Sequence, residues 1–312
     1  MAIIDKKGRL HGKLGKLNYR VLKNGLEVVS TLPKRVRQTR ATKESGLEFG
    51  LASNTASIIR TAFESVTLLN DSGMTNRLTS TVLRSIKNSA TKGRGERDLH
   101  DGDLSHLKDF QFNTNSPLTD VLPVTPQCLI TEGKRLKVHL PVFQGADLKR
   151  MPYGTTCIME LVLIAFDFRK KYYETLDYTN IEIDRKQNNS ISWEPEVEIP
   201  AGCIAILSMS LNYSSYSSNT NSYTHLNSKA FSPAAIVMAT SIPEDQVSNV
   251  QEKRENAIEI SDYLGSELLN KILELRLKDR KYQAELRGKQ KPRPKPLPDV
   301  RPVLMKGKKY FK

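Results

Sequence analysis

One apolar segment, TTCIMELVLIAFDF at residues 155–168, constrains the fold of this 312-residue chain more than any other feature. Successive side chains of a β-strand point to opposite faces of its sheet. Met159 and Leu163 would point to one face here, and Val162 and Ile164 to the other, so both faces are apolar. We therefore predict that this segment is a central strand buried on both faces.

Further β-prone segments surround it and are separated by turn residues such as Pro-Tyr-Gly, Asn-Asn-Ser and Pro-Ala-Gly. They span residues 136–143, 172–183, 191–199, 203–215 and 230–242. Segments of this kind are typical of hairpin or Greek-key links. The predicted fold class is mainly β, with an antiparallel sandwich of the immunoglobulin-like or jelly-roll type over residues 128–245. Cys157 and Cys203 lie in apolar segments and are expected to pack as small hydrophobic side chains.

The region before the sandwich divides into three parts. Residues 1–42 are predicted to be a basic arm with a β-hairpin over 17–32, because Asn24-Gly25 between β-prone runs favours a type I′ turn. Residues 43–90 show helical spacing, broken near Asp71-Ser72-Gly73, which predicts a helical pair. Residues 91–127 are predicted to be an irregular connector that packs on the body through Leu107, Phe110 and Phe112.

The region after the sandwich is predicted to be an amphipathic helix within residues 246–288, followed by an extended Pro/Lys-rich tail over 289–312. The apolar stripe of the helix begins at Ile260 and recurs every three or four residues. Its members are Ile260, Leu264, Leu268, Ile272 and Leu275. The stripe must be buried, either on the chain's own sandwich or on another copy. We expect the second, as a subunit interface in an oligomer larger than a dimer.

The net charge of +14 is concentrated at the two ends. Residues 1–50 carry +8 and residues 276–312 carry +11, whereas residues 51–275 carry −5. Positive charge concentrated at the ends of a chain is typical of arms that contact acidic neighbours or a polyanion. The alternative is that both ends are solvated tails. The candidate contact residues are Lys34, Arg35, Arg37 and Arg40 in the first arm and Lys289, Lys291, Arg293 and Lys295 in the second.

No common catalytic signature is present: the sequence lacks GxxxxGK[ST], HExxH, GxSxG and a strand-linked GxGxxG. The densest titratable cluster is RDLHDGDLSH, which holds Asp98, His100, Asp101, Asp103 and His106. Imidazole and carboxylate groups can bind zinc or manganese, but this spacing matches no familiar site. We therefore predict no catalytic residue, no metal and no cofactor.

Three cysteines, an odd number without a CxxC pair, indicate a reducing compartment. No window approaches the ~20 apolar residues of a membrane helix, and the basic start does not resemble a signal peptide. We expect a cytoplasmic protein that does not insert into membranes. The Ser/Asn-rich stretch with Tyr213, Tyr216 and Tyr223 is either a recognition loop or an exposed hairpin loop.

Four motifs in order are GKLGKLNYRVLKNGLEVVSTLP, KESGLEFGLASNTASIIR, LKDFQFNTNSPL and VHLPVFQGADLKRMPYGTTCIMELVLIAFDF. This order, over about residues 8–245, resembles an uncharacterised family of bacterial hypothetical proteins. The resemblance implies a basic Gly-rich N-terminal hairpin, a helical linker and a β-sandwich. It implies no activity and no functional residues.

The predicted function is that of a non-enzymatic structural subunit of a larger particle, filament or ribonucleoprotein. Basic arms on a compact body suit an assembly, because a partner offsets the entropy lost when the arms become ordered. The alternative is an accessory protein that binds DNA or RNA without sequence specificity.

Overall fold

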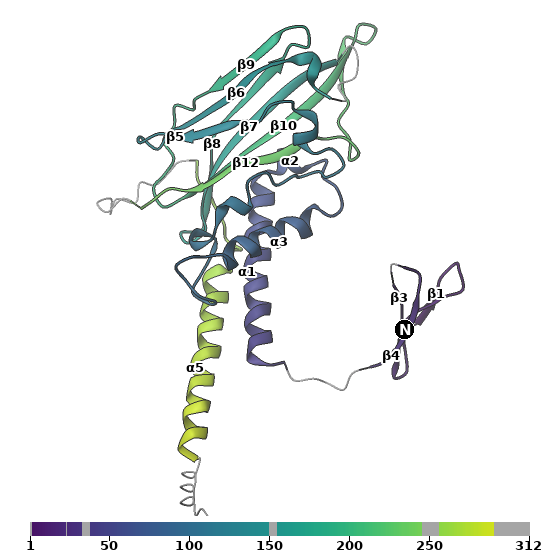
Figure 1. Cartoon of the computed structure of the whole chain (residues 1–312), viewed down its shortest axis with the longest axis vertical. Coiled ribbons are helices and arrows are strands. Elements are labelled where there is room, and N and C mark those ends of the chain that lie inside the picture. Colours follow the sequence, from purple (N-terminus) through teal and green to yellow (C-terminus); the bar gives the residue numbers. More distant parts are fainter. Residues whose placement is uncertain (1, 23, 33–37, 150–154, 245–255, 290–312) are drawn as a thin grey trace, which may run out of the picture.

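Three layers form the body of the protein: a three-stranded sheet, a six-stranded sheet and a layer of helices (Figure 1). The computed structural model describes residues 2–22, 24–32, 38–149, 155–244 and 256–289. The protein is mainly β, and its sheets are antiparallel, as the sequence predicts.

The six-stranded sheet forms the middle layer, and its central strand is β7 (Thr155–Asp167). β7 pairs with β8 (Tyr172–Ile183) on one side and with β10 (Ile204–Ser217) on the other. The remaining strands are β11 (Ser222–His225) and β12 (Ala234–Ser241), which both pair with β10, and β13 (Ile258–Glu259), which pairs with β8. The predicted central strand is therefore confirmed.

One face of this sheet packs on a three-stranded sheet. The smaller sheet contains β5 (Gln127–Ile130), β6 (Leu136–Gln144) and β9 (Asn188–Trp193). Leu161 and Leu163 of β7 join Leu207 of β10 and Leu140 of β6 in one buried cluster between the sheets. The structure confirms this packing of two antiparallel sheets, and it adds the short strands β5 and β11, which were not predicted.

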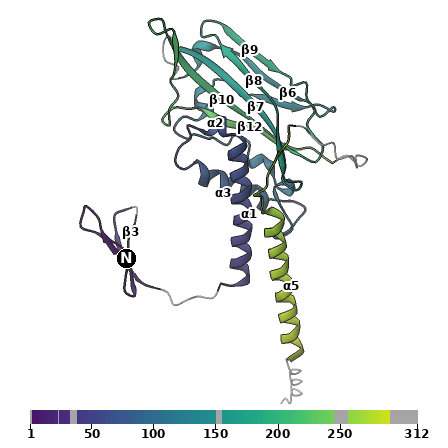
Figure 2. The same cartoon turned by 180° about the vertical axis from the view of Figure 1, so that it is seen from behind.

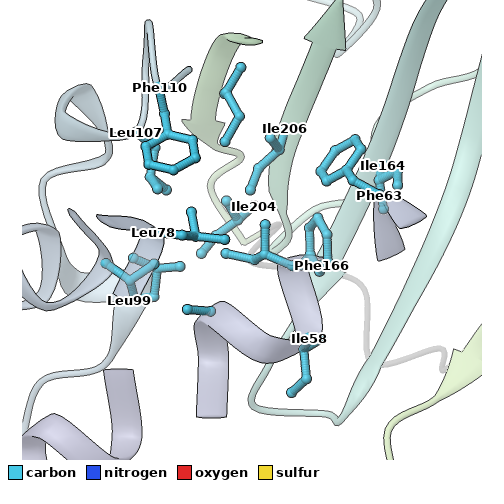
Figure 3. Close-up of a cluster of buried hydrophobic side chains, with 14 of the residues drawn as sticks. Ile58, Phe63, Leu78, Leu99, Leu107, Phe110, Ile164, Phe166, Ile204 and Ile206 are labelled. Atoms are coloured by element: carbon cyan, nitrogen blue, oxygen red, sulfur yellow. The ribbon is translucent and has the colours of Figure 1, made fainter. Parts of the chain in front are cut away.

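The opposite face of the middle sheet is covered by helices, an arrangement that was not predicted from the sequence. Ile164 and Phe166 of β7 pack with Ile204 and Ile206 of β10 against Phe63, at the end of α1 (Figure 3). The helices are α1 (Arg40–Ala62), α2 (Glu64–Thr67) and α3 (Met74–Lys87). Helical spacing identifies the apolar face of a helix but not the surface that covers it.

The connector between α3 and β5 is irregular, as predicted. It contains the short 3-10 turns η1 (Leu99–Asp101) and η2 (Leu104–His106) and the single turn α4 (Leu118–Val121); η3 (Gly145–Asp147) follows β6. Leu107, Phe110 and Phe112 are buried, which confirms the expected packing. The amide of Asp109 donates to the Ile236 carbonyl over 2.8 Å, which ties the connector to the edge strand β12.

α5 (Gly265–Lys289) lies beside α1 in both views (Figures 1 and 2). Its first residue is later than predicted, because the amide of Ile260 donates to the Lys171 carbonyl and so extends the pairing of β13 with β8. Ile260 is buried in the cluster of the helical layer, and Leu268 is half-buried against it. Ile272 is fully buried beside Gly95 of the connector. The expected contact with another copy is therefore wrong for Ile260 and Ile272, whose partners lie in the same chain.

The other two members of the predicted stripe lie outside this cluster. Leu275 and Leu47 line a groove of ≈ 430 Å³ between α5 and α1. Leu264 is 46% exposed, and for this residue a contact with another copy stays a prediction.

Buried ion pairs also hold α5 against α1. Glu44 and Glu48 lie on successive turns of α1 and are 3% and 1% exposed. Glu44 pairs with Arg40 at 3.0 Å and with Arg276 of α5 at 3.6 Å. Glu48 pairs with Arg97 of the connector at 2.8 Å. Loss of one partner would leave a buried charge uncompensated. The Glu44–Arg276 pair thus helps to fix α5 on α1, and the Glu48–Arg97 pair fixes the connector there.

The N-terminal residues form a separate four-stranded sheet, which stands apart from the body in both views (Figures 1 and 2). Its strands are β1 (Ala2–Ile4), β2 (Leu10–Leu14), β3 (Leu17–Val21) and β4 (Glu27–Thr31). β3 and β4 are the predicted hairpin, and Gly25 has a φ of 84°, in the region that glycine favours. β1 and β2 were not predicted.

Gly95 is the position where a single methyl group should dislodge α5. It has a φ of +83°, and a Cβ atom there would lie 2.5 Å from Cγ2 of Ile272. We expect Gly95→Ala to lower the free energy of unfolding by about 2 kcal/mol or more, through backbone strain and overpacking. Urea unfolding measures the change.

Gly93→Ala is the matched control, because no atom lies within 4 Å of a Cβ at that position. We expect it to stay within about 0.5 kcal/mol of the wild type. Equal unfolding midpoints for the two variants would contradict the packing of Ile272 against this loop.

Candidate interaction surface

The strand register of the N-terminal sheet sorts its side chains onto two faces. Ala2, Gly12, Tyr19 and Val29 lie side by side across the four strands. Because side chains alternate along a strand, the residues two positions away share this face. We call it the apolar face; it comprises Ala2, Ile4, Leu10, Gly12, Leu14, Leu17, Tyr19, Val21 and Val29, with Glu27 and Thr31 on the last strand.

The opposite face is polar and positively charged. We call it the basic face; it comprises Ile3, His11, Lys13, Asn18, Arg20, Val28 and Ser30. Asp5, in the turn before β2, accepts hydrogen bonds from the Arg9 side chain and from the amides of Lys7 and Arg9. Within the described part of the chain, no ion pair involves Lys13 or Arg20. Their charges are therefore available to an outside group.

No residue that the structure describes covers the apolar face. Ile4 is 66% exposed, Leu14 56% and Val29 54%, and no described residue between 2 and 32 is buried. A small sheet gains independent stability in water only when a hydrophobic face is packed. Alternating apolar residues such as Leu10 and Leu14 were the sequence signal for this surface, but the hairpin alone was recognised.

Most of the sequence-predicted basic contacts fall where the structure describes no side chain. Lys34, Arg35, Arg37, Lys291, Arg293 and Lys295 lie outside the described residues, and Lys289 is the last residue of α5. Arg40 is the first residue of α1, where it pairs with Glu44 and with Asp279 of α5. It therefore contributes to the helix contact within the chain.

The cluster in RDLHDGDLSH joins the helical layer to the end of β7. Asp98 accepts two hydrogen bonds from the Arg169 guanidinium, at 2.7 and 2.9 Å. Asp101 pairs with Arg169 at 2.9 Å and with Lys92 at 3.0 Å. Nε2 of His100 accepts the amide hydrogen of Phe168 over 3.1 Å. These three members of the cluster, Asp98, His100 and Asp101, have structural partners.

The remaining members of that cluster also have neighbours. Nε2 of His106 lies 2.6 Å from Nδ2 of Asn88, and Asp103 accepts the Ser105 amide. Among the residues that the structure describes, no three His, Cys, Asp or Glu side chains gather in a group that could hold a metal ion.

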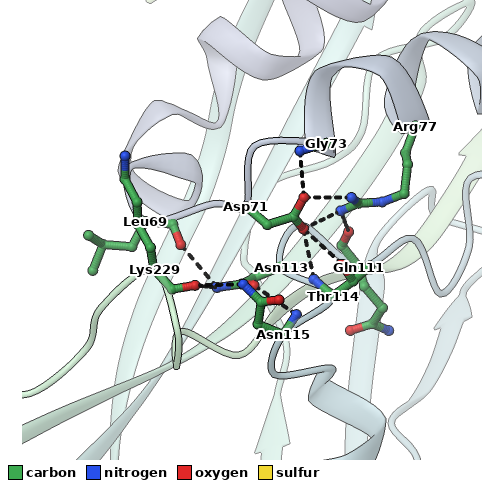
Figure 4. A network of polar contacts seen from close by, with 9 residues as sticks. All are labelled: Leu69, Asp71, Gly73, Arg77, Gln111, Asn113, Thr114, Asn115 and Lys229. Atoms are coloured by element: carbon green, nitrogen blue, oxygen red, sulfur yellow. Dashed lines mark hydrogen bonds and ion pairs between the residues drawn. The ribbon is translucent and has the colours of Figure 1, made fainter. Parts of the chain in front are cut away.

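A second polar network fixes the start of α3 to the connector (Figure 4). Asp71 accepts from both terminal nitrogens of Arg77 at 2.7 Å and from the amides of Gly73 and Thr114. The guanidinium of Arg77 is the main cause of a strongly lowered pKa of Asp71. Asn113 donates to the carbonyls of Leu69 and Lys229. The Asp71 carboxylate is thus a structural anion that the surrounding donors hold in place.

The cysteine and tyrosine side chains of the sandwich are also structural. The three cysteines are free thiols, Cys157 and Cys203 are fully buried as expected, and burial raises the pKa of Cys157 to about 12. Tyr213 is fully buried, whereas Tyr216 and Tyr223 are exposed. The ring centroids of Tyr216 and Tyr223 lie 5.2 Å apart across the β10–β11 hairpin. The stretch forms the β10–β11 hairpin, and a recognition role for its exposed tyrosines stays a prediction.

Comparison of the chain with protein-family models, with curated proteins and with solved structures finds no match. The resemblance to a bacterial family thus stays a prediction. Among the described residues, no helix is long and apolar enough to cross a membrane.

His100 should make stability depend on pH. Burial lowers its pKa below the ordinary 6.5, and this effect exceeds those of the surrounding Asp98, Arg169, Asp167 and Asp101. The unfolded chain therefore binds the proton first, so the stabilisation is complete above pH ~6.5 and is lost as the pH falls below it. We expect the free energy of unfolding to fall between pH 7 and 5, by at most about 1.4 kcal/mol per pH unit from this group.

His100→Gln should make this slope shallower, because its amide oxygen can accept the Phe168 amide hydrogen without titrating. His139→Gln, at an exposed position on β6, is the control and should leave the slope unchanged. Urea unfolding across the pH range provides the comparison. An unaltered slope for His100→Gln would refute this role.

Proposed function

We propose that this chain is a non-enzymatic structural subunit that assembles by packing the apolar face of its N-terminal sheet on the same face of a second copy. The uncovered apolar face carries this proposal. Ile4, Leu14 and Val29 remain more than half exposed, although they lie side by side with other apolar side chains. A contiguous apolar surface of this kind marks an interaction site.

The distribution of charge favours a second copy as the partner. Lys13 and Arg20 lie on the basic face, so two sheets that meet through their apolar faces keep these charges outward. Glu27, on the last strand, is the only charged member of the apolar face. The result would be a sandwich of two four-stranded sheets ~10 Å apart, which is a common sheet packing.

The size of the face is consistent with a dimer contact. Strands of five residues span ~17 Å, and four strands at ~4.8 Å spacing place the outer strand axes ~14 Å apart. Each copy offers an exposed apolar surface that includes Ile4, Leu14 and Val29. Two such faces present roughly 500 Å² in projection, so the sheet pairing supplies part of the more than ~1,000 Å² that a stable contact buries.

The body is a less suitable cover for the apolar face. The middle sheet of the body is already packed between the smaller sheet and the helices. The sheet pairing alone makes a two-fold dimer. Growth into a particle or filament requires a second contact, and exposed Leu264, directly before α5, is the predicted residue for it.

We also propose that the chain is not an enzyme, and its two best-defined titratable clusters support this. The titratable clusters around Asp98 and Asp71 are occupied by arginine partners. We also propose a cytoplasmic location, because all three cysteines are free thiols.

A second candidate function rests on the basic face. Lys13 and Arg20 lie there without an ion-pair partner among the described residues, and Lys6, Lys7 and Lys16 occupy the adjoining turns. Such a face would contact phosphates of DNA or RNA without reading the sequence.

Adjacent residues on opposite faces provide a matched test. Leu14→Asp/Val29→Asp places two carboxylates on the apolar face, whereas Asn18→Asp/Val28→Asp places them on the basic face. We expect the wild type and the basic-face variant to sediment as dimers or larger species at micromolar concentration. The apolar-face variant should sediment as a monomer whose body keeps the wild-type urea midpoint.

A monomeric wild type would overturn the assembly proposal, as would equal association of the two variants. Nucleic-acid retention by the same proteins tests the second candidate. A larger loss of nucleic-acid retention in the basic-face variant than in the apolar-face variant would support nucleic-acid binding by the basic face.

A further inference from the structure

A groove of ≈ 490 Å³ runs between α3 and the connector segment 106–114. One wall is a face of α3 that includes Asn76, Arg77, Thr81 and Arg84, and the other includes His106 and Lys108. The groove lies on the body and involves neither the N-terminal sheet nor the C-terminal tail. Its function is thus independent of the assembly proposed above.

The charge of the groove is opposite to that of its surroundings. Residues 51–275 carry a net charge of −5. Yet the lining brings Arg77, Arg84 and Lys108 together, with Asp109 as its only acidic residue. Arg77 is neutralised by Asp71. Arg84 and Lys108 are exposed, and neither makes an ion pair within the described part of the chain.

Both walls of the groove are fixed by hydrogen bonds of their lining residues. The network around Asp71 holds Arg77 and Thr114 together, and the Arg77 guanidinium also donates to the Gln111 carbonyl over 3.2 Å (Figure 4). The connector wall is tied to β12 by the hydrogen bond from the Asp109 amide to the Ile236 carbonyl. The cations therefore stand on a prepositioned scaffold, which reduces the entropy lost on binding a ligand.

We propose that this groove binds the phosphate group of an anionic ligand. Arginine and lysine are the usual cationic partners of phosphate oxygens, and hydroxyl and amide groups add neutral hydrogen-bond donors. Thr81, one turn before Arg84 on α3, and Asn76, about two turns before it, supply these donors. The ligand is either a free phosphate ester or the backbone of a nucleic acid, and the two present the same chemistry to the groove.

His106 provides a local reporter for the test. The full-length protein, labelled with carbon-13 in its histidine rings, is titrated with inorganic phosphate, a mononucleotide and a ~8-nucleotide single strand. We expect saturable shifts of the His106 resonances, assigned by their absence in His106→Gln. The resonances of His139, on the exposed side of β6, should stay in place. A ring signal inside the groove separates binding there from binding to the basic arms.

Two matched variants identify the cations that hold the ligand. Arg84→Gln/Lys108→Gln removes both unpaired charges of the groove, and we expect it to raise the Kd about tenfold or more. Lys87→Gln/Lys149→Gln removes two exposed charges outside the lining and should keep the wild-type Kd. Equal urea midpoints establish that the folds are comparable.

The three probes distinguish the source of the phosphate. Similar affinity for the mononucleotide and the oligonucleotide would support a free phosphate ester, and much tighter binding of the oligonucleotide would support a nucleic-acid backbone. The proposal is overturned if no probe shifts His106 saturably. Equal Kd values for the two double variants would also overturn it.

Discussion

Burial of both faces of β7 is the constraint on which the rest of the structure depends. Leu161 and Leu163 require one covering layer, and Ile164 and Phe166 require another, because each buried apolar side chain contributes about 1.5–3 kcal/mol. The smaller sheet supplies the first layer, and the helices supply the second. The positions of α1, the connector and α5 all follow from this second requirement, since their apolar side chains join Phe166 in one cluster.

The N-terminal sheet presents the contrary case, since one of its faces is apolar and uncovered. Its residues 2–32 include no buried side chain among those described, whereas the body closes both of its apolar clusters within the chain. A partner that covers Leu14 and Val29 would supply the missing layer. The same physical rule thus accounts for the self-contained body and for the proposed dependence of the arm on a second copy.

The sequence predicted those features that depend on local pattern. The buried segment at 155–168, the Asn24-Gly25 hairpin and the irregular connector were identified, because alternation, turn residues and the absence of a period are local signals. The partner of an apolar stripe is not a local property. Ile272 packs beside Gly95, which is distant in sequence, and Glu44 pairs with Arg276 for the same reason. The groove beside α3 likewise combines residues from two separated segments.

Hydrogen exchange of the full-length protein at nanomolar and micromolar concentrations tests the central claim most directly. If a second copy covers the apolar face, amides of β2 and β3 will exchange more slowly at the higher concentration, because opening of the sheet then requires dissociation. Amides of β7 and β10 will exchange at the same rate at both concentrations. Exchange of β2 and β3 that does not change with concentration would contradict the account.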